Sequence, residues 1–280
     1  NFLIEIKIIM PQQKFNLSQS HADISKEFEL SLKELAQPAN NNNKLFVVCS
    51  ALIEASPKVT PEDIFAAGIA TFEGTILSST SSDWTTQLAL MKILDLSILN
   101  IANKTLYNQN FPLLSRVLRA ISSVTVSGTA NHQGEEGFST TVRHMITLSK
   151  TSIIAINVQE ENKKHMLKLL QDCILAYFDH SSPKIRKTAQ LCAMELLSCA
   201  KNDVASVHIC QYTHAVLTTA TTQSIFHNND LQLMRIFHML HFVRQASGLL
   251  LLKIQPSIEN TKSNSNSIHQ DLIQLFVVVT

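Results

Sequence analysis

Hydrophobic residues recur every three or four positions along most of this chain, and polar breaks divide the pattern into segments of helical length. The clearest example lies at residues 163–200, where the break at 179–183 separates two amphipathic segments. Ser181 or Ser182 can cap the second segment, and Pro183 is tolerated at a first helical position. The pattern predicts two antiparallel helices, with apolar stripes at Met166, Leu169, Leu170, Cys173, Ile174, Tyr177 and Phe178 in the first and at Ile185, Ala189, Cys192, Ala193, Leu196 and Leu197 in the second.

The same pattern predicts helices on both sides of this pair. Thr60 can cap a helix at 61–77, Pro61 suits its first position, and Glu62 and Asp63 lie beside the positive end of its dipole. Residues 84–106 are so densely apolar that we expect their helix to be buried on more than one side. Further helices are predicted at 17–35, 44–55, 111–126, 138–158, 204–226 and 230–254.

The predicted helices group into pairs. The pairs begin near Pro61, Phe111, Lys163 and Val204, at intervals of roughly 40 to 50 residues, which is typical of HEAT and armadillo repeats. The predicted fold is therefore all-α, an α-solenoid of antiparallel helix pairs in which each pair buries its apolar face against its neighbours.

Three regions are expected along the chain. Residues 1–59 hold N-terminal helices with an asparagine-rich linker, 60–254 hold the helical repeats, and 255–280 hold a polar linker and a truncated C-terminal segment. The chain starts with Asn1 and stops in an apolar run at 276–279, so we expect it to be a fragment of a longer protein.

One motif carries a family resemblance. An Asp ends the first helix of the central pair, followed by Pro, by an apolar residue and Arg, by Ala three residues on, and by Leu. This order resembles the inter-helix segment of HEAT repeats, and its members are Asp179, Pro183, Ile185, Arg186, Ala189 and Leu196. Together with 236–240 and 84–107, residues 182–190 look more particularly like the ribosomal RNA-processing protein 12 family of HEAT-repeat ribosome assembly and export factors.

Composition agrees with a helical fold. The 280 residues are 45% hydrophobic but contain only 6 glycines, 7 prolines and 6% aromatics, which argues against a fold of strands and turns. The net charge is +1, yet residues 1–80 carry six Lys and Arg against nine Asp and Glu, whereas 143–201 carry nine against five. The odd cysteine count, without a close CxxC pair, favours reduced, buried thiols and an intracellular compartment. The apolar run at 2–10 is too short to span a bilayer.

No pattern of enzymatic chemistry stands out. Gly128, Gly134 and Gly137 lack the spacing and the preceding strand of a phosphate-binding loop. No Ser, His and Asp set has a sequence context that would orient it, and adjacent glutamates at 135–136 and 160–161 do not imply a catalytic cleft. We expect no catalytic site and no cofactor.

Metal binding is also not expected. Cys210 and His214 lie one helical turn apart with His208 nearby, and His238 and His241 form a second pair. Two residues on one helix supply at most half of a tetrahedral zinc site. Histidines packed or capped between helices are the better explanation of both pairs.

A basic surplus surrounds the central helix pair. Helix starts with lysine and arginine can contact phosphates without reading sequence, so five lysines are candidate contacts to RNA or to an acidic partner: Lys163, Lys164, Lys168, Lys184 and Lys187. Arg186 is expected instead to make a structural bond with Asp179. Arg116, Arg119, Arg235 and Arg244 extend a basic edge if the helices stack in register.

The resemblance implies a function that the residues alone do not. It implies a non-catalytic scaffold of the nucleolus and nucleus that binds pre-ribosomal proteins and pre-rRNA, supports rRNA maturation and subunit export, and contacts the nuclear export machinery. No membrane partner is expected. The alternative is a HEAT-repeat nuclear transport receptor or trafficking adaptor that binds cargo peptides, and this binding should depend less on salt than phosphate contacts do.

Overall fold

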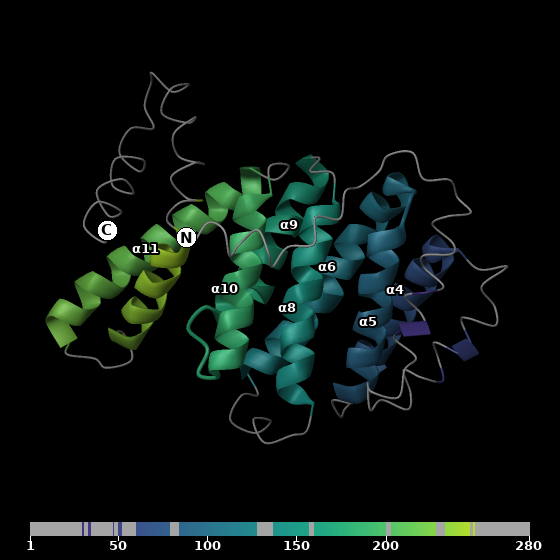
Figure 1. Ribbon diagram of the computed structural model, residues 1–280, viewed down its shortest axis with the longest axis horizontal. Helices are drawn as coiled ribbons and strands as arrows, with labels where there is room; N and C mark the ends of the chain where they lie inside the picture. Colours follow the sequence, from purple (N-terminus) through teal and green to yellow (C-terminus); the bar gives the residue numbers. More distant parts are fainter. Residues whose placement is uncertain are drawn as a thin grey trace.

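The described part of the chain is a row of helices. The computed structural model describes residues 60–78, 84–127, 137–156, 160–199, 203–227 and 233–246, with isolated positions at 30, 33, 34, 47, 50, 51 and 249. Figure 1 shows the helices side by side along the long axis of the molecule. They are α4 (Pro61–Ser78), α5 (Trp84–Asn100), α6 (Lys104–Ser127), α8 (Phe138–Ala155), α9 (Glu160–Cys173), the 3-10 helix η2 (Leu175–Tyr177), α10 (Pro183–Ser198) and α11 (Asp203–His227), followed by a helix at 233–246.

The helices form two layers. In the first layer α4 packs on α6, α6 on α9 and α9 on α11, whereas in the second α5 packs on α8 and α8 on α10. The helix at 233–246 continues the second layer, because the Nε2 of Gln190 on α10 donates to the carbonyl of His238 at 3.3 Å. The chain therefore alternates between layers, which is the arrangement of an α-solenoid of helix pairs, as predicted.

The central hairpin forms as its apolar pattern predicts. The stripes of α9, η2 and α10 are buried, and Pro183 occupies the start of α10 after Ser182. The expected capping signal before α4 is also present, since the Asp63 amide donates to the Thr60 hydroxyl at 3.2 Å and the Thr60 amide donates to the Asp63 carboxylate at 3.1 Å. The Thr60 hydroxyl also donates to the Asp63 carboxylate at 2.7 Å, and this bond together with that from the Thr60 amide holds the pKa of Asp63 below its usual value.

The predicted helix at 84–106 is wrong at its C-terminal end. α5 stops at Asn100, and α6 starts at Lys104 rather than at Phe111. The Glu62 carboxylate of α4 accepts hydrogen bonds from the amides of Ala102 (2.9 Å) and Asn103 (3.1 Å), which fixes the turn. The expectation that α5 is buried on more than one side is confirmed, because Met91 and Ile93 are both buried although they point in different directions.

A proline inside α6 creates a defect that the next repeat repairs. Pro112 has no N–H to donate to the carbonyl of Asn108 four residues earlier. The side-chain amide of the buried Asn162 on α9 donates to that carbonyl at 3.2 Å. The contact supplies the missing hydrogen bond and also joins two successive helices of the first layer.

Buried aromatic and sulfur-containing side chains occupy the space between the layers. Phe178 lies 4.8 Å from Phe242 between ring centroids, so the last described helix shares the core of the central pair. Among the described cysteines, Cys173, Cys192 and Cys210 are buried and Cys199 is partly exposed, and all four are free thiols. The residues outside the described ranges include Cys49, all of the predicted region at 1–59 apart from its isolated positions, the region at 255–280, and the loop glycines 128 and 134.

We predict that Asn162→Ala lowers the free energy of unfolding by about 1–2 kcal/mol, because it leaves the part-buried carbonyl of Asn108 without a donor. In a Pro112→Ala background the new amide at 112 donates to that carbonyl, and the cost of Asn162→Ala falls below about 0.5 kcal/mol. Chemical denaturation of the unsubstituted protein, the two single variants and the double variant measures both costs. An equal loss in both backgrounds would contradict the repair.

Candidate partner-binding surfaces

The five lysines predicted from sequence do not form one patch. Lys163, Lys164 and Lys168 lie on α9 in the first layer, whereas Lys184 and Lys187 lie at the start of α10 in the second. The 14 residues of α9 put roughly 21 Å between its two ends, and the turn into α10 follows its C-terminal end. The structure therefore separates the lysines into two groups on different layers.

The α9 group is partly compensated by acidic neighbours. Lys163 pairs with Glu160 at 3.5 Å, and Glu160 and Glu161 occupy the first turn of the helix. Lys164 and Lys168 are exposed. They are the members of this group that are best placed to meet a phosphate.

The α10 group is less compensated. Lys184 and Lys187 are exposed, and the first turn of α10 contains no acidic residue to offset them or the positive end of the helix dipole. The nearest carboxylates along the chain have other partners, since Asp179 pairs with Arg235 at 2.7 Å and Glu195 with Lys150 at 2.7 Å.

The predicted bond between Arg186 and Asp179 is wrong. Arg186 Nη1 donates to the carbonyl of His180 at 2.8 Å, while Asp179 accepts from Arg235 in the helix at 233–246. Arg186 is thus structural, as expected, but it fixes its own turn. The Asp179 carboxylate instead connects this turn to the next repeat.

The remaining motif residues serve packing. Ile185, Ala189 and Leu196 are buried in the interface between the layers. Pro183 is exposed at the first position of α10, where its missing N–H costs nothing. The HEAT-like motif therefore marks the structural turn of the repeat.

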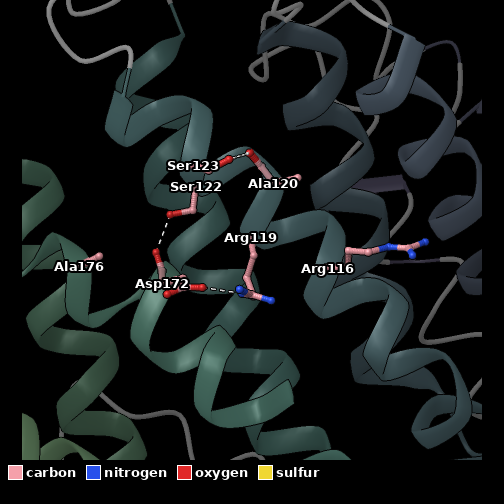
Figure 2. Close-up of a pocket in the computed structure, with 7 residues that line it drawn as sticks. All are labelled: Arg116, Arg119, Ala120, Ser122, Ser123, Asp172 and Ala176. Carbon is pink, nitrogen blue, oxygen red and sulfur yellow. Dashed lines mark hydrogen bonds and ion pairs between the residues drawn. The ribbon is translucent and has the colours of Figure 1, made fainter. Parts of the chain in front are cut away.

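A groove opens on the first layer between α6 and the end of α9 (Figure 2). Arg119 Nε lies 2.6 Å from the Asp172 carboxylate, and the Ser122 hydroxyl donates to the Asp172 carbonyl at 2.5 Å. Arg116 points away from Asp172 and pairs with Glu73 of α4. The groove has a volume of about 440 Å³ and is lined by Arg116, Arg119, Ala120, Ser122, Ser123, Asp172 and Ala176.

The buried Tyr177 hydroxyl forms a network with two hydroxyl groups of α6, one of them on Ser122, which lines the groove. The Tyr177 phenol lies 2.5 Å from the Thr125 hydroxyl and 3.0 Å from that of Ser122, and burial raises its pKa to about 12. Since each arginine of the groove has a carboxylate partner, the groove joins α4, α6 and α9 and presents little free charge. Arg116 and Arg119 therefore contribute less to a basic edge than their sequence positions imply.

Ionic contacts also cross the second layer. Lys150 on α8 meets Glu195 on α10, and the lysine side chain is only 17% exposed. Burial alone would lower the pKa of Lys150, but the hydrogen bond and charge of Glu195 outweigh it and raise that pKa. Burial lowers the pKa of His144 on α8, against the opposing charge of Asp95 on α5. Polar pairs thus connect α5, α8 and α10.

The metal candidates from sequence remain separate side chains. Among the described residues, no three His, Cys, Asp or Glu side chains are grouped as a metal site requires. Cys210 is buried, and burial raises its pKa to about 11. Over the same ranges, no helix is long and apolar enough to cross a membrane.

The sequence analysis missed a set of exposed apolar residues on the second layer. Leu191 on α10 is 43% exposed, and Met234 and Phe237 in the next helix are 53% and 64% exposed. The helical spacing of the sequence does indicate their exposure, because each residue lies on the side of its helix opposite the buried apolar stripe.

These contacts define a class of protein. Antiparallel helix pairs stacked in two layers, each joined to the next by buried side chains and ion pairs, make an α-solenoid of the HEAT type. The family model described as RRP12-like, N-terminal HEAT repeats, matches residues 45–274, and the chain belongs to this family. No curated protein matches the chain, and no solved structure matches it.

We predict that Glu195→Gln destabilises the chain by about 1–2 kcal/mol, because it leaves the poorly exposed Lys150 ammonium without its carboxylate. Glu160→Gln is the matched control, since the Glu160 side chain is 89% exposed and its pair with Lys163 is long. We expect the control to change stability by less than about 0.5 kcal/mol. Thermal and urea unfolding distinguish the two variants, and equal effects would contradict a structural role for the Lys150 pair.

Proposed function

We propose that this chain is part of a non-catalytic scaffold in ribosome biogenesis, acting in the nucleolus and nucleus. The observation that carries the proposal is the family match to RRP12-like N-terminal HEAT repeats over residues 45–274. The stacked helix pairs support it, because a solenoid offers long exposed faces to large partners. On this proposal the protein binds pre-ribosomal particles, supports rRNA maturation and assists subunit export together with the nuclear export machinery.

Charge supports a direct contact with pre-rRNA. Lys164 and Lys168 are exposed on the outer side of α9, and Lys163 lies beside them. Lysines on a helix hold phosphate groups by charge and do not read bases. The proposed contact is therefore to the RNA backbone and should weaken steeply as salt rises.

The alternative function, a transport receptor or trafficking adaptor, uses the same fold with a different partner. The exposed side chains of Leu191 and Phe237 favour some recognition of protein segments. Affinity purification of the full-length protein separates the two functions. Small-subunit precursor rRNA should copurify with it, and recovery of vesicle coat or cargo proteins without rRNA would refute the ribosomal assignment.

We predict that Lys164→Glu with Lys168→Glu weakens binding to single-stranded pre-rRNA fragments. Because two phosphate contacts are lost, the decrease of log affinity with log salt should become less steep, by about 1.4 in slope. Fluorescence anisotropy over a salt series measures both quantities. The control is Lys164→Arg with Lys168→Arg, which keeps the charge and should keep the slope. An unchanged slope in the glutamate variant, with helicity intact by circular dichroism, would remove these lysines from the RNA contact.

A further inference from the structure

One outward face of the second layer combines apolar and basic side chains. It consists of the exposed Lys184, Lys187 and Leu191 and the partly buried Met194 on α10, and of the exposed Met234 and Phe237 in the helix at 233–246, and we call it the Lys–Met face. Leu191 is 43% exposed and Phe237 is 64% exposed. Large apolar side chains exposed next to each other on a surface mark sites of protein interaction.

One contact joins the two helices of the face directly, and two more join the segment before α10 to the helix at 233–246. Gln190 Nε2 donates to the carbonyl of His238 at 3.3 Å, and Arg235 pairs with Asp179 just before α10 at 2.7 Å. The rings of Phe178 and Phe242 meet beneath them with centroids 4.8 Å apart.

Helical phase then fixes which side chains share the outer surface. Ile185, Ala189 and Leu196 point inward on α10, so Lys184, Lys187 and Leu191 point outward. Met239 and Phe242 point inward in the next helix, so Met234 and Phe237 point outward on the same layer.

The charge of the face is uncompensated. Among the described residues, neither Lys184 nor Lys187 has an ion pair, and the two carboxylates nearest along the chain are held by Arg235 and Lys150. The start of α10 adds the positive end of a helix dipole to the same side. A partner that covers the apolar side chains therefore binds most tightly if it also places negative charge next to the lysines.

We propose that the Lys–Met face binds an acidic amphipathic helix of a partner protein. The apolar side of that helix covers Leu191, Met194, Met234 and Phe237, and its Asp or Glu side chains reach Lys184 and Lys187. Methionine side chains are flexible and polarisable, so they can adapt to the apolar side of a bound helix. This inference rests on the proposed function and names the chemistry of one protein partner of the scaffold.

The same face fits RNA less well. Proteins that bind single strands stack successive bases on several aromatic rings, whereas this face has one exposed aromatic ring, that of Phe237, and its other apolar members are aliphatic or thioether side chains. The lysines on α9, in the other layer, are the proposed RNA contacts. The two layers would thus hold different partners.

Site-specific photocrosslinking tests the face in the full-length protein in cells. p-Benzoylphenylalanine replaces Leu191, and the crosslinked products are sequenced by mass spectrometry. The matched control carries the same probe at Val207 on α11 in the first layer, which is 49% exposed. We expect the probe at 191, and not the probe at 207, to capture a peptide with Asp or Glu next to apolar residues at helical spacing.

Charge reversal provides the second arm. Lys184→Glu with Lys187→Glu should reduce the yield of the 191 crosslink by about tenfold, because attractive contacts become repulsive. Lys184→Arg with Lys187→Arg should preserve it. Capture of RNA or of segments without acidic residues, absence of any product, or a yield insensitive to charge reversal would each overturn the proposal. Copurification of precursor rRNA with the unsubstituted protein is scored separately, so failure of the face is distinguished from failure of the ribosomal assignment.

Discussion

Each helix of this chain carries an apolar face that only its neighbours can cover, and this constraint shapes the whole fold. Phe178 illustrates it, because its ring is covered by Phe242 from the following pair. The polar contacts obey the same constraint. Asn162 satisfies a carbonyl in the preceding pair that Pro112 leaves open, and Arg235 holds the Asp179 carboxylate of the pair before its own. Stability therefore accumulates interface by interface, and each pair depends on the next.

Local pattern was sufficient to predict the helices that the structure describes from residue 60 onward, their pairing and the turn around Pro183, because apolar spacing and capping act within a few residues. It did not predict the break after Asn100, which depends on Glu62, about 40 residues earlier in the chain. It also misassigned the Asp179 carboxylate, whose partner Arg235 lies in another repeat. Such contacts depend on how the helices of successive repeats align with one another. The pattern of a single sequence does not predict this alignment.

The candidate surfaces show the same limit. The five lysines are close in sequence, yet the alternation of the chain between layers separates Lys164 from Lys184. Conversely, Leu191 and Phe237 are distant in sequence, yet their helices lie side by side in the second layer. In a solenoid, residues that are close in sequence can therefore lie on different faces, and residues that are distant in sequence can lie on the same face. The proposed RNA contacts and the proposed protein-binding face accordingly lie on opposite layers.

The reactivity of the thiols tests the two-layer packing most directly. Burial between the layers raises the pKa of Cys173 to about 12 and of Cys192 to about 11, so both thiols stay protonated at pH 8. Labelling of the native protein with a thiol reagent, mapped by mass spectrometry, should modify Cys199 and spare Cys173, Cys192 and Cys210 until denaturant is added. Rapid labelling of Cys173 or Cys192 in the native, helical protein would contradict the packing on which the account depends.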